Sequence, residues 1–256
     1  MRNAMKKSAY AVAAILALFL LTTGPLAAST TADFDLNGVG SGANLAGVYT
    51  SPYSGSINYG STVPVICDDF SDESYVPEDW TAYVTSLSSI TSGTADTSVL
   101  KWQGSYDGLN QAQAYEAAAL LSVDILTNTG TAQEDYSFAL WALFDPYGNG
   151  TTDLGAFGQL AYYGDTSDLS NAGIYLNNAV AAAKAGTVDL SNYDVTIYSY
   201  DTGAHGACGT SCSPPQEFIT VSTAEPPAPA LLGVDLLGLA GLILIARRYG
   251  WLARVS

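Results

Sequence analysis

The sequence predicts an α+β fold: a single β-rich domain with a helical insertion of about three helices, followed by a C-terminal helix of the transmembrane type. Short alternating runs rich in Gly, Ser, Thr and Tyr occupy the N-terminal part and predict strands joined by glycine turns. Helical periodicity dominates the middle, and strand patterns return near residue 193. The order strands, helices, strands favours α+β over a parallel α/β sheet.

Five segments carry the strand pattern. They are "LAGVYTSPY" (45–53), "INYGSTVPVICDDF" (57–70), "WTAYVTSLSSI" (80–90), "YDVTIYSY" (193–200) and "QEFITVS" (216–222). No internal repeat is visible, and no linker between residues 33 and 222 is long enough to separate two domains. We therefore expect one domain, large enough to bury a core.

Three segments predict helices. The first, 110–128, begins at a plausible N-cap, Asn110, and repeats apolar residues at helical spacing. The second, 134–146, is stopped by Pro146, because the residue before a proline avoids the helical region. The third, 167–186, ends at Gly186, which suits the left-handed position after a helix.

The first 28 residues have the three-part layout of a secretory signal peptide. Arg2, Lys6 and Lys7 precede an apolar stretch from Ala9 to Leu21, and small residues follow. A membrane anchor is the alternative, but this apolar stretch is short for a span. We expect cleavage near Ala28, which leaves residues 29–223 as the exported α+β domain.

A second apolar segment, 230–246, lies close to the C-terminus. Its residues are apolar or glycine except Asp235, and at about 1.5 Å per residue they reach roughly 25 Å. The segment is therefore a short but possible membrane helix; the alternative is a buried helix of the folded domain. The proline break before it and the arginines after it favour the membrane helix. Arg247, Arg248 and Arg254 would hold its end on the cytoplasmic side.

The tail from 224 to 256 resembles the PEP-CTERM sorting signal of Gram-negative bacteria. The resemblance rests on Glu225, Pro226 and Pro227, the apolar Leu/Gly-rich segment and the arginine cluster. It implies an exosortase-like processing enzyme as partner, transient anchoring in the inner membrane, and release to the cell surface or an extracellular polysaccharide matrix. Ala224 replaces the first proline of that pattern, and Asp235 interrupts its apolar run.

The scarcity of lysine and arginine argues against nucleic acid as a partner. Between residues 29 and 225, the only Lys or Arg residues are Lys101 and Lys184, against 23 of the 24 acidic residues. Nucleic-acid binding needs Lys and Arg for phosphate contacts, so it is excluded. Such an acidic domain suits divalent cations or cationic partners.

The cysteines fit an exported protein. Cys208 and Cys212, in "CGTSC", are spaced for a short disulfide, with free thiols as the alternative. Cys67 remains single, and a buried small hydrophobe is the common role of a lone cysteine.

"VPVICDDF" (63–70) and "YSFALWALFD" (136–145) together resemble the thioester domains of bacterial surface adhesins. In that family a strand cysteine is joined to a Gln side chain of a TQxA-type motif, and the thioester captures amines on a neighbouring surface. The resemblance implies Cys67 as the thioester thiol. It also places Ser137 where the Gln is expected, with Gln133 one helical turn earlier.

Two acidic loops are candidate calcium sites, because calcium prefers hard oxygen ligands. Neither has EF-hand spacing, and solvated acidic loops are the alternative. Their possible ligands are Asp68, Asp69, Asp72 and Glu73 in the first loop, and Asp145, Asn149 and Asp153 in the second.

The sequence lacks an obvious catalytic motif, and its single histidine, His205, leaves little material for zinc or Ser-His-Asp chemistry. We expect no enzyme and no cofactor beyond possible calcium. The leading hypothesis is a transiently anchored surface or extracellular-matrix protein with a structural or adhesive role. A covalent adhesin using Cys67 and a carboxylate-dependent glycan hydrolase are the alternatives.

Overall fold

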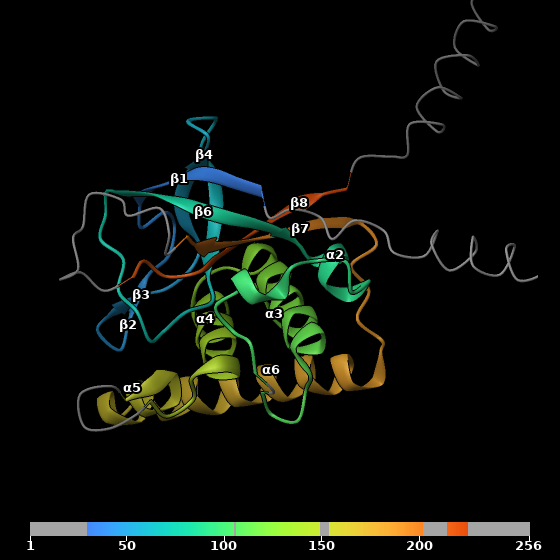
Figure 1. Cartoon of the computed structure of the whole chain (residues 1–256). Coiled ribbons are helices and arrows are strands. Elements are labelled where there is room, and N and C mark those ends of the chain that lie inside the picture. Colours follow the sequence, from blue (N-terminus) through green and yellow to red (C-terminus); the bar gives the residue numbers. More distant parts are fainter. Residues whose placement is uncertain (1–29, 105, 149–153, 202–213, 225–256) are drawn as a thin grey trace, which may run out of the picture.

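A computed structural model describes residues 30–104, 106–148, 154–201 and 214–224. Six antiparallel strands form a closed barrel in the order β1-β4-β5-β8-β7-β6. The helices lie on one side of the barrel, with α3 and α4 between the barrel and α6 (Figure 1). The α+β class predicted from the order of elements is confirmed.

The strands have the following bounds. The barrel contains β1 (Thr30–Gly38), β4 (Tyr53–Ile57), β5 (Val63–Cys67), β6 (Glu78–Ser86), β7 (Tyr193–Tyr200) and β8 (Phe218–Thr223). A separate small hairpin contains β2 (Asn44–Leu45) and β3 (Val48–Tyr49).

β1 closes the barrel, and the sequence analysis did not predict it. It pairs with β4 on one side and β6 on the other, with Phe34 opposite Trp80. Ala32, Phe34 and Leu36 alternate toward the core and are buried, as expected for a strand with one covered face.

The other predicted strands are found with some changes of boundary. The pattern over 193–200 matches β7, and that over 216–222 contains most of β8. The predicted strand over 80–90 ends early, because the Ser86 side chain accepts a hydrogen bond from Ser89 N and caps a short helix, α2 (Leu87–Thr91). Of the predicted strand 45–53, only Tyr53 belongs to the barrel; Leu45, Val48 and Tyr49 lie in the β2–β3 hairpin.

The helices occupy the connection from β6 to β7. The three predicted ones are present as α3 (Gln111–Thr127), α4 (Thr131–Phe144) and α6 (Thr166–Ala185). Asn110 forms a full capping box with Gln113, and Gly186 adopts the left-handed conformation after α6 (φ 64°). Two further helices, α2 and α5 (Gly155–Tyr163), and the short 3-10 helix η1 (Thr97–Val99) were not predicted.

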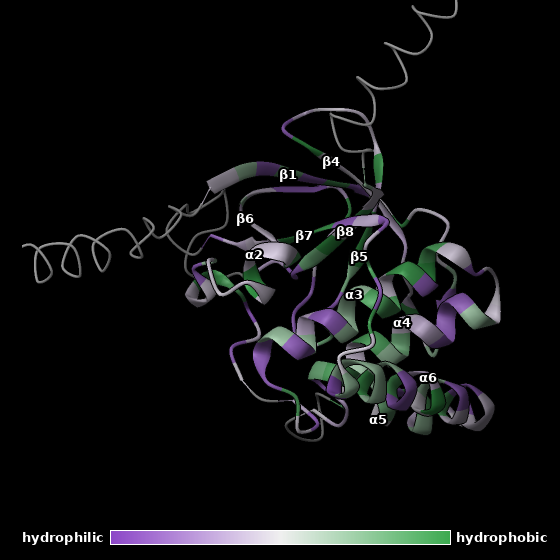
Figure 2. Ribbon diagram, turned by 90° about the vertical axis from the view of Figure 1, so that its right-hand side faces the viewer, coloured by the Kyte–Doolittle hydropathy of each residue, from purple (hydrophilic) through white to green (hydrophobic). Residues whose placement is uncertain are grey.

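The core is continuous from the barrel to α6. More than half of the residues of α3 and of α4 are buried, because both helices are covered on two sides. Their ribbons carry many hydrophobic residues (Figure 2). Phe34, Trp80 and Phe218 fill the barrel with stacked and tilted rings, and the same cluster extends through Tyr115 to Leu176.

Several predicted features lie outside the described residues and stay predictions. They are the signal peptide (1–28), the sorting motif at Glu225, Pro226 and Pro227, the apolar helix 230–246, the arginines 247, 248 and 254, and the Cys208–Cys212 disulfide.

Within the four described segments, we find no helix with the length and apolar character needed to cross a membrane.

Candidate functional site

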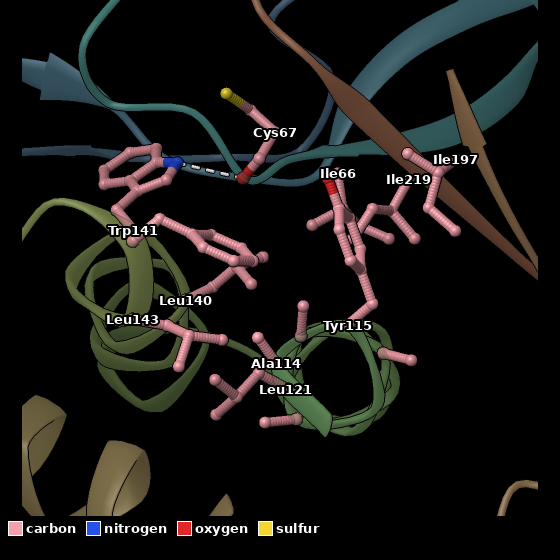
Figure 3. Packing of buried hydrophobic residues seen from close by; sticks show 14 of the residues in the cluster. Ile66, Cys67, Ala114, Tyr115, Leu121, Leu140, Trp141, Leu143, Ile197 and Ile219 are labelled. Atoms are coloured by element: carbon pink, nitrogen blue, oxygen red, sulfur yellow. Dashed lines mark hydrogen bonds between the residues drawn. The ribbon is translucent and has the colours of Figure 1, made fainter. Parts of the chain in front are cut away.

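Cys67 ends β5 at the point where the barrel meets α4. The residue is completely buried. Trp141 of α4 donates its indole N–H to the Cys67 carbonyl oxygen over 2.9 Å, while the sulfur points away from α3 (Figure 3). Ser51 accepts from Cys67 N through its Oγ (3.0 Å), and its carbonyl accepts from Ser137 Oγ (3.4 Å). The cysteine strand and the Trp141 helix, which the sequence resemblance paired, are therefore in contact.

The Cys67 thiol lies beside a carboxamide that the sequence analysis did not consider. The thiol donates to the Asp69 carbonyl oxygen (3.1 Å), and Asp69 N donates back to the sulfur (3.4 Å). Gln216 Nε2 donates to that same carbonyl oxygen (2.6 Å). Sulfur and carboxamide are neighbours because both contact one atom, and Ser74 Oγ holds the Gln216 backbone N–H at 3.0 Å.

Gln216 reaches this place through strand pairing. β5 and β8 pair at Ile66–Ile219 and Cys67–Phe218, and Asp68 N continues the ladder to Glu217 O (3.4 Å). The end of β5 therefore meets the residues just before β8. No local sequence pattern predicts this contact, because the two strands are about 150 residues apart in the chain.

The α4 candidates for the acyl group are placed elsewhere. The Gln133 carboxamide donates to Ile125 O (2.7 Å) and Asn128 O (3.0 Å) at the end of α3. Ser137 lies near the site, but its hydroxyl donates to Ser51 O and Gln133 O. The sequence placed Ser137 and Gln133 at the position of the Gln, but the glutamine beside Cys67 is Gln216, just before β8.

Burial raises the pKa of the Cys67 thiol well above its usual value, and the negative charge of the nearby Asp69 raises it further. The thiol is therefore protonated at neutral pH. A protonated, buried thiol reacts poorly with external reagents, so its chemistry is directed to groups already inside the fold.

Two carboxyl groups are buried behind the site. Asp68 and Glu217 lie opposite each other across β5 and β8, both essentially inaccessible to solvent. Glu217 accepts hydrogen bonds from Lys101 N (2.9 Å), Tyr115 OH (2.6 Å) and Ser199 Oγ. Burial and the Glu217 charge raise the pKa of Asp68 well above its usual value, so Asp68 holds the proton of the pair.

A third group of charges surrounds Lys101. Its ammonium contacts Asp69 Oδ2 and lies 2.5 Å from Asp72 Oδ2. Asp69 is fully buried, and its Oδ1 also accepts from Ser71 and Asp72. The lysine therefore compensates a carboxylate that would otherwise be buried without a counter-charge.

The carboxylates predicted as calcium ligands have protein partners in the structure. Asp69 and Asp72 are bound to Lys101, Asp68 faces Glu217, and Glu73 accepts from Tyr75 OH (3.1 Å). In the second loop, Asp145 Oδ1 accepts from Gly148 N (2.9 Å), whereas Asn149 and Asp153 lie outside the described residues. Among the residues described, no group of three or more His, Cys, Asp or Glu side chains is arranged to hold a metal ion.

A cleft of about 520 Å³ opens over Gln216. Its walls come from β3, β4, the loop after β5, α4 and α5, and Trp141 lies at its border. Gln216 is partly exposed while Cys67 is not. Gln216, rather than Cys67, is therefore the residue of the site that borders the cleft.

Comparison with known proteins shows fold-level likeness to domains of streptococcal adhesins. No protein-family profile and no curated protein sequence matches the chain. Among solved structures, it is similar to the N-terminal thioester domain of the protein F2 like fibronectin-binding protein from Streptococcus pneumoniae, at 15% identity and a TM-score of 0.44, covering 75% of this chain and 94% of that one.

Two further structures come from Streptococcus pyogenes. The thioester domain of the fibronectin-binding protein SfbI is 9% identical, with a TM-score of 0.42 over 79% of this chain and 97% of that chain. The N-terminal domain of the pilus tip adhesin Cpa is 9% identical, with a TM-score of 0.43 over 77% and 95%. All three likenesses are remote.

Proposed function

We propose that this protein is a surface or extracellular-matrix adhesin that joins Cys67 to Gln216 in an internal thioester and then attaches covalently to an amine. The observation that carries the proposal is the shared hydrogen-bond acceptor: the Cys67 thiol and the Gln216 carboxamide both donate to Asp69 O. A thiol and a primary carboxamide that share one acceptor lie close together, and these are the two groups that thioester formation requires.

The bond forms by loss of ammonia. Cys67 Sγ attacks Cδ of Gln216, the Cδ–Nε2 bond breaks, and the thiol proton leaves with the nitrogen as ammonia. An incoming primary amine then attacks Cδ, the C–S bond breaks, and the thiol of Cys67 is restored. The product is an amide between Gln216 and the partner.

The surroundings suit both steps. The sulfur is buried within the fold, and proximity to Gln216 replaces a bimolecular encounter with an intramolecular one. Gln216 borders the open cleft, so the acyl carbon is on the side from which an amine arrives. The protein is consumed once per bond, which makes it a stoichiometric adhesin rather than an enzyme.

We further propose the export route implied by the two ends of the sequence. The signal peptide would start export, residues 230–246 would hold the precursor in the inner membrane, and an exosortase-like enzyme would cleave near Glu225, Pro226 and Pro227. The support for this export route comes from the sequence of the two ends, which lie outside the described residues. A mature exported product that still contained residues 230–256 in an intact-mass spectrum would contradict it.

Intact-mass measurement of the full-length protein tests the thioester. We expect a deficit of about 17 Da, the mass of one ammonia, in the wild type, and its loss on treatment with methylamine, which adds at Gln216. Cys67→Ala and Gln216→Glu should lack the deficit. Because Glu matches Gln in shape, the second variant keeps the packing and isolates the chemistry.

Gln133→Ala is the matched control. Gln133 is the glutamine that the motif on α4 suggested, yet its carboxamide bonds the end of α3. This variant should retain the mass deficit and the methylamine reaction. A wild-type protein of full theoretical mass that is inert to methylamine would reject the proposed thioester.

A further inference from the structure

The cleft above Gln216 is larger and more polar than an alkyl amine requires. At about 520 Å³ it falls within the roughly 300–1,000 Å³ typical of sites that enclose a whole small ligand. A lysine side chain, a single chain of methylenes, would leave much of this volume to water. The acceptor that fills it is a broader molecule.

The walls combine aromatic rings with short polar groups. Tyr49 and Tyr75 are 52% and 67% exposed at the mouth, and Tyr53, Phe70 and Trp141 lie further in. Ser71, Ser74 and Gln159 supply hydrogen-bonding groups. Flat rings that present apolar faces beside hydroxyl and amide groups fit a sugar, which has apolar C–H faces and a rim of hydroxyls.

Charge in the cleft has one sign. Among the described residues, Asp72 and Glu73 are the charged ones that line it, and no described lysine lines it. Lys101 already compensates Asp72, whereas Glu73 bonds only the neutral Tyr75 hydroxyl among its described contacts. The cleft therefore attracts a cationic group to the side of Glu73.

The negative charge of Glu73 also affects how fast different amines can react, because it changes the fraction of each amine that is uncharged. Only an uncharged amine attacks a thioester, and lysine, with a pKa of about 10.4, is almost wholly protonated at pH 7. Nearby carboxylates favour the ammonium form further. The amine of a 2-amino sugar is acidified by the adjacent C–O bonds and titrates near neutrality, so a carboxylate can attract it as a cation and then accept its proton.

We propose that the acceptor is an amino sugar of a partly deacetylated polysaccharide, bound between the cleft tyrosines with its amine beside Glu73 and Gln216. This inference rests on the proposed Cys67–Gln216 thioester. The amine attacks Gln216 Cδ, gives its proton to Glu73 and displaces the Cys67 thiolate, which takes up that proton. The glycan ends in amide linkage to Gln216.

Rates of adduct formation on the full-length protein test the inference. A glucosamine tetramer, its fully N-acetylated counterpart and Nα-acetyl-lysine methylamide are compared at equal concentration and pH 7, with hydroxylamine, an uncharged amine at this pH, as the reporter of an intact thioester. We expect the glucosamine tetramer to couple at least about tenfold faster than the lysine compound, because more of its amine is uncharged. The acetylated tetramer should not couple.

Variants locate the effect in the cleft. Glu73→Gln and Tyr75→Ala should each slow coupling of the glucosamine tetramer several-fold, whereas Tyr59→Ala, at an exposed tyrosine that does not line the cleft, should not. A lysine compound that couples as fast as the tetramer would overturn the amino-sugar inference and favour a protein acceptor. Failure of hydroxylamine to react would instead remove the thioester itself and this inference with it.

Discussion

Asp68 and Glu217 face each other across β5 and β8, and the two buried carboxyl groups differ in their hydrogen bonds. Glu217 accepts from three donors, whereas no described group donates to either carboxylate oxygen of Asp68. A shared proton on Asp68 therefore lowers the energy of the pair. The other charges near Asp68 are Asp69, which raises its pKa, and Lys101, which lowers it.

The sign of the pH dependence follows from the raised pKa. In the unfolded chain Asp68 ionises near pH 3.9, but in the folded protein it keeps its proton to higher pH. Between these two values the folded state binds more protons, so the free energy of unfolding falls as pH rises. Glu217, whose pKa is also raised by burial, contributes in the same direction.

Asp68→Asn should reduce this loss of stability. The amide never ionises and can donate an N–H to Glu217. We expect denaturation midpoints to decline less between pH 5 and pH 9 in the variant than in the wild type. Asp79→Asn, at an exposed position of β6, should leave the decline as it is. Equal slopes for Asp68→Asn and the wild type would show that the pair does not control pH stability.

At the scale of elements, one side chain, Gln133, joins α3 to α4. α4 also supplies Trp141 to Cys67 and Ser137 to Ser51, and neither contact involves the Gln133 side chain. Gln133 ties the start of α4 to the end of α3 by donating to two carbonyl groups there. Carbonyls at a helix C-terminus lack partners within the helix, and a side chain that satisfies them stabilises the turn.

Gln133→Ala should lower the free energy of unfolding by about 1–3 kcal/mol, the cost of leaving such groups unpaired. Chemical denaturation followed by circular dichroism measures this change. Asn177→Ala, on the exposed face of α6, serves as the control and should change stability by less than about 0.5 kcal/mol. If Gln133→Ala did not change the free energy of unfolding, water would satisfy these carbonyl groups equally well.

At the scale of the whole molecule, closure of the barrel depends on β1. This strand bridges β4 and β6 and inserts Phe34 among Trp80, Tyr198 and Phe218, with ring centroids 4.7–5.3 Å apart. The same core continues into α3 and α4 and fixes the β5–β8 junction where Cys67 lies. Barrel packing and site geometry are therefore coupled.

Phe34→Ala should destabilise the protein by about 3–5 kcal/mol, because it leaves a cavity where a fully buried ring was. Thermal and denaturant unfolding measure the loss. Tyr162→Ala removes a ring of similar size that is 75% exposed, and it should have little effect. A small effect of Phe34→Ala would indicate that β1 is not needed to complete the barrel.

Local patterns predicted the elements best where they contain their own signals. Asn110 and Gln113 mark the start of α3, Gly186 marks the end of α6, and the alternation over 193–200 marks β7. The sequence patterns do not predict β1 or α5, and they predict a strand over the residues that form α2. A serine cap overrode the strand pattern at Ser86, whereas the pairing that closes β1 into the barrel is set by distant strands.

Local residue patterns were enough to predict the α+β class, the three long helices and the strand that carries Cys67. The carboxamide beside Cys67 became identifiable as that of Gln216 only in the folded chain. The reason is physical: capping and periodicity act over a few residues, but the contact between Cys67 and Gln216 depends on how β8 pairs with β5 after a long helical excursion. Such pairing is chosen by packing of the whole core, and that core also placed Gln133 away from the thiol.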